Sequence, residues 1–259
     1  MKVESLWRYP VKSMQGERLE EAFIGFPGVY GDRLYAFRSS AAPAAFPYFT
    51  GRELQELLLY RPAYRDREAM ARPSNLLEAE SIGSGLTPVY AGPGELALDV
   101  TTPAGAVFAI DDPRLVQVLR EGVRAAHELT LMRSDRAMTD CRPVSLISTQ
   151  TVSQLGRELG AEMDKRRFRA NVYLDLESGS GFGEDAFLGL KLQIGEKAVV
   201  EVMVRDGRCK MITLDPATGQ ANPDVMRLVS QSHEGKAGVY AAVLVEGMVR
   251  AGDVVRVVD

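Results

Sequence analysis

The sequence predicts a strand-dominated α+β fold, in which a β-barrel or strongly bent sheet carries flanking helices. Short apolar or alternating runs separated by glycine-rich turns are the main evidence, because this pattern is typical of barrels and bent sheets. Start signals for helices occur at only a few positions. The 259 residues correspond to one large or two small domains, and 46% hydrophobic with 25% charged residues is ordinary for a globular protein.

The N-terminal quarter is expected to begin with strands and to end in a short helix. An extended segment over 3–7 stops before Pro10, because a residue that precedes proline avoids the helical region. Further strands are expected up to Ile24 and again over 33–37. Thr50 and Glu53 have the spacing of a capping box, which predicts a short helix that ends before Pro62.

The remaining elements follow from turn and cap signals, although residues 63–95 carry no clear pattern. Asp112 and Pro113 supply an N-cap and a first-turn proline, which predict a helix. Two further helices are expected to begin at about Thr149 and near Asp224. The sequence predicts strands or hairpin arms over 95–100, 106–110, 129–132, 144–148, 167–175, 190–195, 198–204, 238–247 and 253–258.

Composition excludes several functional classes. A net charge of −4 disfavours a nucleic-acid binder that relies on a global positive field. Two cysteines and two histidines rule out a disulfide framework, an all-cysteine zinc site, a three-histidine metal site and an internal four-cysteine iron–sulfur cluster. No phosphate-loop, nucleophile-elbow or zinc-protease motif occurs. Without a leader or a long apolar run, we expect a cytoplasmic protein with no membrane or nucleic-acid partner.

The segment "RFRAN" is a candidate anion site. If it is a strand, Arg167, Arg169 and Asn171 lie on one face and apolar side chains lie on the other. Guanidinium groups match the geometry of phosphate, which favours anion binding. A solvated strand face explains the same pattern equally well.

Two other segments offer polar groups from fixed positions. Lys12 and Ser13 follow a rigid Tyr-Pro-Val turn and could face a ligand, although a solvated lysine is the simpler interpretation. Ser148, Thr149 and Gln150 lie where a strand turns into a helix, and free backbone N–H groups at a helix start bind anions. Capping of the helix would explain the same residues, and the two roles are compatible.

Cys209 is the most informative single residue. Arg205, Arg208 and Lys210 surround it in the sequence, and positive neighbours favour the thiolate form that acts as a nucleophile or a metal ligand. Cys141 has no comparable support and is interpreted as an incidental thiol.

Several of these segments together resemble the MOSC-domain family, named for the C-terminal domain of molybdenum cofactor sulfurases. The resemblance is to the branch that carries an associated N-terminal β-barrel-like region and includes the mitochondrial amidoxime reducing component and its bacterial relatives. The matching segments, in family order, are "YPVKS" (9–13), "GDR" (31–33), "RFRAN" (167–171), "RC" with "TLDPATG" (208–219) and "GVYAAVLVEGMVRAGDVV" (238–255).

This resemblance implies a molybdenum cofactor (Mo-molybdopterin) and a site to hold it. Cys209 matches the cysteine that binds molybdenum in the family. The positions that match the pterin- and phosphate-binding residues are Lys12, Ser13, Arg33, Ser148, Thr149, Gln150, Arg167, Arg169, Asn171 and Arg208. The implied architecture is a MOSC-type β-barrel domain, formed by 1–33 plus 125–259, with a smaller α/β unit of the MOSC N-terminal type at 34–124.

The resemblance further implies an oxidoreductase that reduces N-hydroxylated small molecules such as amidoximes, hydroxylamines and N-hydroxylated bases. No iron–sulfur, flavin or nicotinamide motif occurs, so we expect a separate electron-donor protein of the ferredoxin or flavoprotein type. The alternative function is a carrier of the molybdenum cofactor or a sulfur-transfer module without its own reductase activity.

Overall fold

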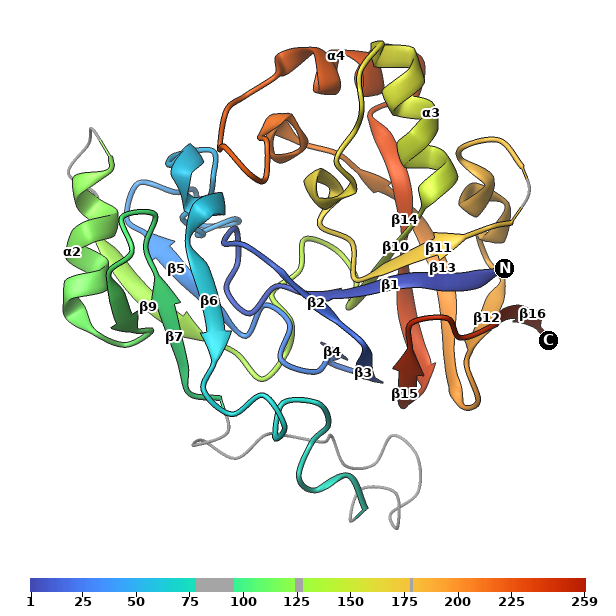
Figure 1. The fold of residues 1–259 in the computed structure, drawn as a ribbon, viewed down its shortest axis with the longest axis horizontal. Coiled ribbons are helices and arrows are strands. Elements are labelled where there is room, and N and C mark those ends of the chain that lie inside the picture. The colour runs from blue at the N-terminus through green and yellow to red at the C-terminus, as the bar shows by residue number, and fades with distance from the viewer. Residues whose placement is uncertain (78–95, 124–127, 178) are drawn as a thin grey trace.

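Strands dominate the computed structural model, which describes residues 1–77, 96–123, 128–177 and 179–259 (Figure 1). The predicted α+β class is confirmed. The strands are β1 (Lys2–Arg8), β2 (Glu17–Leu19), β3 (Glu21–Gly25), β4 (Gly28–Val29), β5 (Tyr35–Ser39), β6 (Arg61–Tyr64), β7 (Leu98–Thr101), β8 (Val107–Ala109), β9 (Leu129–Arg133), β10 (Val144–Ser148), β11 (Val172–Asp175), β12 (Lys191–Ile194), β13 (Ala198–Gly207), β14 (Lys236–Val245), β15 (Gly247–Arg250) and β16 (Val255–Val258).

Each of the three fully described α-helices begins directly after a residue whose side chain caps it. The α-helices that the structure describes in full are α2 (Pro113–Glu121), α3 (Thr149–Leu159) and α4 (Pro223–Ser232), and the described 3₁₀ helices cover Gln55–Leu59, Lys165–Phe168, Gly183–Phe187 and Lys210–Thr213. The side chains of Asp112, Ser148 and Asn222 accept hydrogen bonds from backbone N–H groups in the first turns of α2, α3 and α4. None of the described helices is long and apolar enough to cross a membrane.

The largest sheet has the order β16-β12-β13-β14-β10-β11-β1-β2, and its one parallel pair among the described strands is β10 with β11. Its buried face packs on β3 and β15 around an aliphatic core that includes Leu6, Ile24 and Val200. The expected barrel does not close within the described strands. On the side of β1 that faces away from β11, the last residues of the strand pair with β2. At the start of β1, Lys2 forms a single bridge to Val254, which precedes β16.

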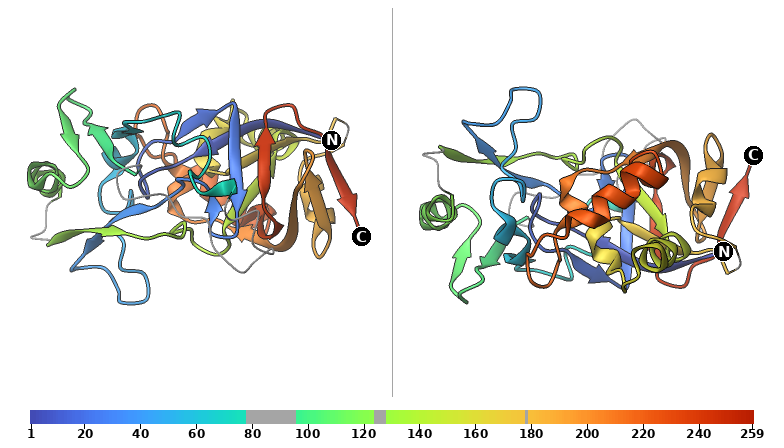
Figure 2. Two further views of the ribbon diagram at one scale, coloured as in Figure 1. Left: turned by 90° about the horizontal axis from the view of Figure 1, so that it is seen from below. Right: turned by 90° about the horizontal axis from the view of Figure 1, so that it is seen from above.

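Helices α3 and α4 lie side by side on the outer face of this sheet (Figure 2). They cover β10, β11 and β14 through a separate apolar core that includes Leu155, Phe168, Tyr173 and Val229. The amphipathic spacing of the two helices accounts for this burial.

The smaller sheets, β5-β9 and β6-β7-β8, lie with α2 at the opposite end of the molecule (Figure 1). Their core includes Leu57, Leu98 and Leu115 but also Val11 and Met14 from the N-terminal segment. The division into 34–124 and the remaining chain therefore stays a prediction.

Local structure differs from expectation at three places. Residues 167–171 do not form a strand, because Asp164 caps a 3₁₀ helix over Lys165–Phe168 and the strand starts only at Val172. The predicted helix after Thr50 is a 3₁₀ helix that starts at Gln55, since the capping-box contacts close a turn at 50–53. The sequence did not predict β4, β6 or β15, and residues 78–95 of the unassigned stretch lie outside the described residues.

Candidate functional site

A polar cavity lies where the large sheet meets the loops that carry the sequence motifs. The cavity and its open mouth contain about 650 Å³ of space. Among the described residues, six cationic side chains and two carboxylates line it: Lys12, Arg33, Arg52, Arg167, Arg169 and Arg208, with Asp140 and Asp206. Ser13, Phe46, Tyr240 and Cys209 also contribute to its wall. An excess of positive charge in a concave site favours an anionic ligand.

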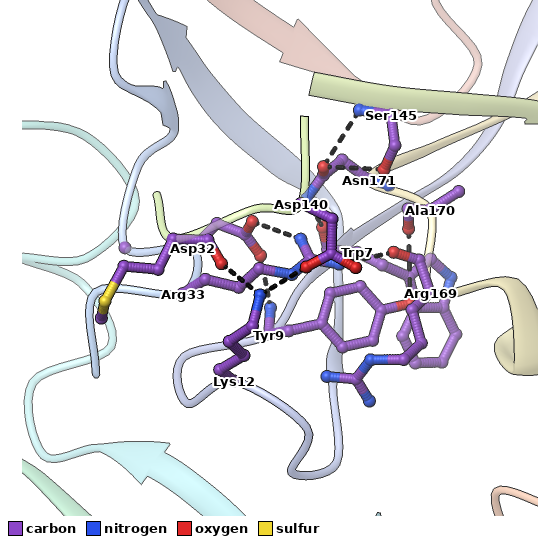
Figure 3. A network of polar contacts seen from close by, with 12 residues as sticks. Trp7, Tyr9, Lys12, Asp32, Arg33, Asp140, Ser145, Arg169, Ala170 and Asn171 are labelled. Carbon is purple, nitrogen blue, oxygen red and sulfur yellow. Dashed lines mark hydrogen bonds and ion pairs between the residues drawn. The ribbon is translucent and has the colours of Figure 1, made fainter. Parts of the chain in front are cut away.

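Tyr9 joins three of the motifs at this cavity (Figure 3). Its backbone N–H donates to Asp32 Oδ1 at 2.7 Å, and Asp32 Oδ2 lies 2.5 Å from Arg33 Nη1. The guanidinium carbons of Arg33 and Arg169 lie 4.7 and 4.3 Å from the centre of the Tyr9 ring. Arg33 Nη2 donates to the carbonyl oxygen of Arg169 at 2.7 Å. Segments far apart in the sequence are thus held in one cluster by cation–π contacts and charged hydrogen bonds.

Three residues that line the cavity have left-handed backbones. The φ angles are 66° for Ser13, 48° for Arg33 and 51° for Arg169. A non-glycine residue in this region costs about 1 kcal/mol, and such conformations concentrate at functional sites. The surrounding hydrogen bonds maintain the strain and turn the three side chains toward the same space.

Arg169 has an unusual electrostatic environment. Its Nη1 donates to the carbonyl oxygen of Met14 at 2.7 Å, but its buried Nη2 has no hydrogen-bond partner. No carboxylate among the described residues lies within ion-pair distance of its guanidinium. Burial, with a smaller contribution from the nearby Arg33, lowers the pKa of Arg169 to about 10. A buried donor without a partner and a charge without a carboxylate are costly, and an anionic ligand would satisfy both.

Lys12 is fully engaged within the protein. Its Nζ donates to Asp140 Oδ1 at 2.6 Å and to the carbonyl oxygen of Met138 at 2.7 Å, and lies 4.6 Å from the centre of the Tyr48 ring. Burial lowers the pKa of Lys12, although Asp140 opposes this effect. The simpler interpretation, a solvated lysine, is therefore wrong.

Cys209 lies at the start of the 3₁₀ helix Lys210–Thr213 and is partly buried. The two arginines that flank the cavity near it are held by protein groups. Arg208 donates to the carbonyl oxygens of Ala237 and Phe168 at 2.7 and 2.8 Å, and its Nη2 lies 2.8 Å from Asp206 Oδ2. Arg167 donates to the carbonyl oxygen of Thr213 and to Asp215, at 2.9 and 2.8 Å. Both arginines therefore brace the segment that carries the thiol.

The other predicted site residues do not line the cavity. Asn171 is fully buried, and its amide oxygen accepts hydrogen bonds from the backbone and hydroxyl of Ser145 (Figure 3). Ser148 caps α3 and donates to Glu184 at 2.6 Å, while Gln150 donates to Asp175 at 2.9 Å. The start of α3 faces the loop at 182–185 instead of the cavity.

Thr149 shares this placement. Its hydroxyl contacts Gln150 Oε1 at 3.2 Å, away from the cavity wall. In this structure Ser148 caps α3, and Thr149, Gln150 and Asn171 form hydrogen bonds away from the cavity.

Sequence reasoning missed Arg52, Asp140, Asp206, Phe46 and Tyr240 as lining residues. Arg52 follows the capping-box threonine, and Asp140 and Asp206 each lie within three residues of a cysteine. Their positions next to the motifs can be seen in the sequence. That their side chains meet in one cavity depends on contacts between distant segments, which the sequence does not show.

Asp206 predicts a specific dependence of stability on pH. Burial raises the pKa of Asp206 from 3.8 to about 6, although Arg208 opposes this effect. The folded protein therefore binds the Asp206 proton more tightly than the unfolded protein does. As pH rises from 3.8 through 6, loss of this proton lowers the free energy of unfolding. In urea unfolding of cofactor-free protein, Asp206→Asn should gain up to about 3 kcal/mol relative to wild type across that range. A difference that does not change with pH would contradict the shift.

No group of three or more histidine, cysteine, aspartate or glutamate side chains among the described residues is arranged to hold a metal ion. A metal at Cys209 would need most of its ligands from a bound organic group.

Comparison with known proteins gives a domain match, a distantly similar protein and weak alignments with solved structures. Residues 133–256 match the MOSC domain. Mitochondrial amidoxime reducing component 2 of Bos taurus is 26% identical over 234 residues, which is 84% of this chain and 67% of the relative. The YUAD protein from Bacillus subtilis aligns with a TM-score of 0.47 at 14% identity, over 98% of this chain and 93% of its own. YiiM from Geobacillus stearothermophilus aligns with a TM-score of 0.36 at 22% identity, and the match covers 45% of this chain and 54% of YiiM.

Proposed function

Because residues 133–256 make this chain a MOSC-domain protein, we propose that it is a molybdenum-cofactor-dependent oxidoreductase that reduces N-hydroxylated small molecules. The observation that carries this proposal is the buried, unpartnered Nη2 of Arg169 in the same cavity as the Cys209 thiol. Similarity to an amidoxime reducing component supports the class of substrate.

The residues present fit Mo-molybdopterin chemically. A soft thiolate such as that of Cys209 suits a metal already bound to dithiolene sulfurs. Arg169 and Ser13 would hold the anionic pterin phosphate, and Lys12 would add positive charge to the same wall while it stays bonded to Asp140 and the Met138 carbonyl. When bound, the cofactor supplies two-electron redox chemistry, and the protein orients it and tunes it.

Reduction of an N-hydroxylated substrate breaks the N–O bond, consumes two electrons and two protons, and releases water. The electrons would come from a separate ferredoxin- or flavoprotein-type donor. The two carboxylates of the cavity differ in whether they can supply a proton. Asp140 stays ionised, because Lys12 lowers its pKa despite burial, whereas burial raises the pKa of Asp206 to about 6. Asp206 can therefore hold a proton on its carboxyl oxygen near neutral pH.

The test is expression in a host that synthesises the molybdenum cofactor. We expect molybdenum and pterin near one equivalent per chain, and reduction of benzamidoxime with a reduced dye as electron donor. Molybdenum without turnover would favour the carrier or sulfur-transfer alternative. Protein with neither molybdenum nor pterin would contradict both functions.

A further inference from the structure

Arg52 differs from the other cationic residues of the cavity. Lys12 and Arg33 are buried and Arg167, Arg169 and Arg208 are partly buried, whereas Arg52 is exposed at the mouth. The turn at 50–53 sets its position, since the backbone N–H of Arg52 donates to the Thr50 hydroxyl at 3.2 Å. Arg52 therefore faces a molecule that arrives from solvent.

This turn lies directly against the segment that follows Cys209. A Cβ added to Gly51 would meet a methyl carbon of Leu214 at 2.9 Å and the sulfur of Met211 at 3.0 Å. Glycine at this position leaves room for the side chains of Leu214 and Met211 to pack against the turn. The close approach brings the Arg52 side chain to the thiol side of the cavity, where interaction with Cys209 raises the pKa of Arg52.

No carboxylate among the described residues forms an ion pair with Arg52. Its guanidinium carbon lies 4.9 Å from the centre of the Phe46 ring, and the Lys12 ammonium lies 5.4 Å from the same ring. Arg52 therefore combines an aromatic contact with proximity to the thiol. The Phe46 ring restricts the guanidinium, whose five N–H donors exceed what the Cys209 thiol can accept, so donors remain for a ligand.

We propose that Arg52, steadied by Phe46, binds an anionic oxygen group of the substrate, a carboxylate or a phosphate, beside Cys209. This inference rests on the proposed function, because it names the class of N-hydroxylated substrate that the site prefers. The cations deeper in the cavity would hold the cofactor, and Arg52 would remain free for the substrate. Guanidinium donors bind carboxylate and phosphate in two-point geometry, which gives selectivity for such groups over neutral ones.

The experiment compares two pairs of probes that differ in one anionic group. The pairs are benzamidoxime with its 4-carboxylate derivative, and 6-hydroxylaminopurine ribonucleoside with its 5′-monophosphate. Binding to cofactor-loaded protein is measured by calorimetry without a reductant, and kcat/KM is measured with the reduced dye. The variants are Arg52→Met, Arg52→Lys and, as a control, Arg61→Met, which changes an exposed arginine outside the cavity.

Wild type should bind the charged member of at least one pair more tightly, and the pair affected identifies carboxylate or phosphate as the group recognised. Arg52→Met should weaken that binding and lower kcat/KM by about 10- to 100-fold, while the neutral probes change less than about threefold. Arg52→Lys should give affinities and kcat/KM values between those of wild type and Arg52→Met. Arg61→Met should match wild type in both. An Arg52-dependent affinity without turnover would support the inference while the proposed function fails.

Three results would overturn the inference. They are equal losses for charged and neutral probes in Arg52→Met, no preference for either charged probe in wild type, and loss of molybdenum from Arg52→Met, which would assign the residue to the cofactor.

Discussion

Replacement of Cys209 by serine is expected to lower the molybdenum content of purified protein by a factor of at least about ten. A serine hydroxyl is a poor ligand for a soft, sulfur-bound metal, and the described residues offer no alternative cluster of ligands. The measurement is the ratio of molybdenum to protein by elemental mass spectrometry after expression in a cofactor-producing host.

Cys141→Ser is the matched control for this prediction. Cys141 is exposed and does not line the cavity, so its replacement should leave the molybdenum content unchanged. Both variants should unfold in urea at concentrations close to that of wild type when cofactor-free. Full molybdenum content in Cys209→Ser would remove Cys209 as the metal ligand.

Replacement of Arg169 by methionine is expected to affect function and stability very differently. We expect cofactor content to fall at least about tenfold, because the variant loses a guanidinium whose buried Nη2 has no protein partner. The free energy of unfolding of cofactor-free protein should change by no more than about 1 kcal/mol, or rise, because removal of a charge that no carboxylate among the described residues compensates offsets the lost contacts with Tyr9 and the Met14 carbonyl. Urea unfolding and molybdenum content of the same preparations give the two quantities.

Arg166→Met serves as the control for Arg169→Met. Arg166 lies nearby in the sequence but pairs with Asp164 at 2.6 Å on a partly exposed face outside the cavity. Its loss should cost about 1 kcal/mol or less and should not change cofactor content. A loss of several kcal/mol in cofactor-free Arg169→Met, with cofactor content retained, would show that Arg169 is a structural brace.

The sequence predicted elements whose signals are local. Asp112 with Pro113, and Ser148 before Thr149, mark helix starts that the structure confirms at α2 and α3. The hairpin around Gly195 is also confirmed, as β12 pairs with β13. Caps, turns and alternation act within a few residues, so they can be interpreted without knowledge of the fold.

Only some of the candidate site residues named from the sequence lie together in the structure. Lys12, Ser13, Arg33, Arg167, Arg169, Arg208 and Cys209 line one cavity, while Asn171 and the residues at the start of α3 do not. The resemblance placed all of them in one site, but α3 turns its first residues toward Glu184, and that direction depends on how the sheet bends.

The sequence by itself determined the strand-rich class and the starts of helices. It also showed a thiol and several cations within the motifs that carry the family resemblance. Only the tertiary structure decided which of these residues meet. Arg169 reaches the cavity from a left-handed backbone after a 3₁₀ helix, and the contacts of its guanidinium with Tyr9 and the Met14 carbonyl maintain that conformation. Arg52 reaches Cys209 through a close approach that Gly51 permits. The placement of both arginines depends on contacts between residues more than a hundred positions apart. A local sequence pattern carries no information about such contacts.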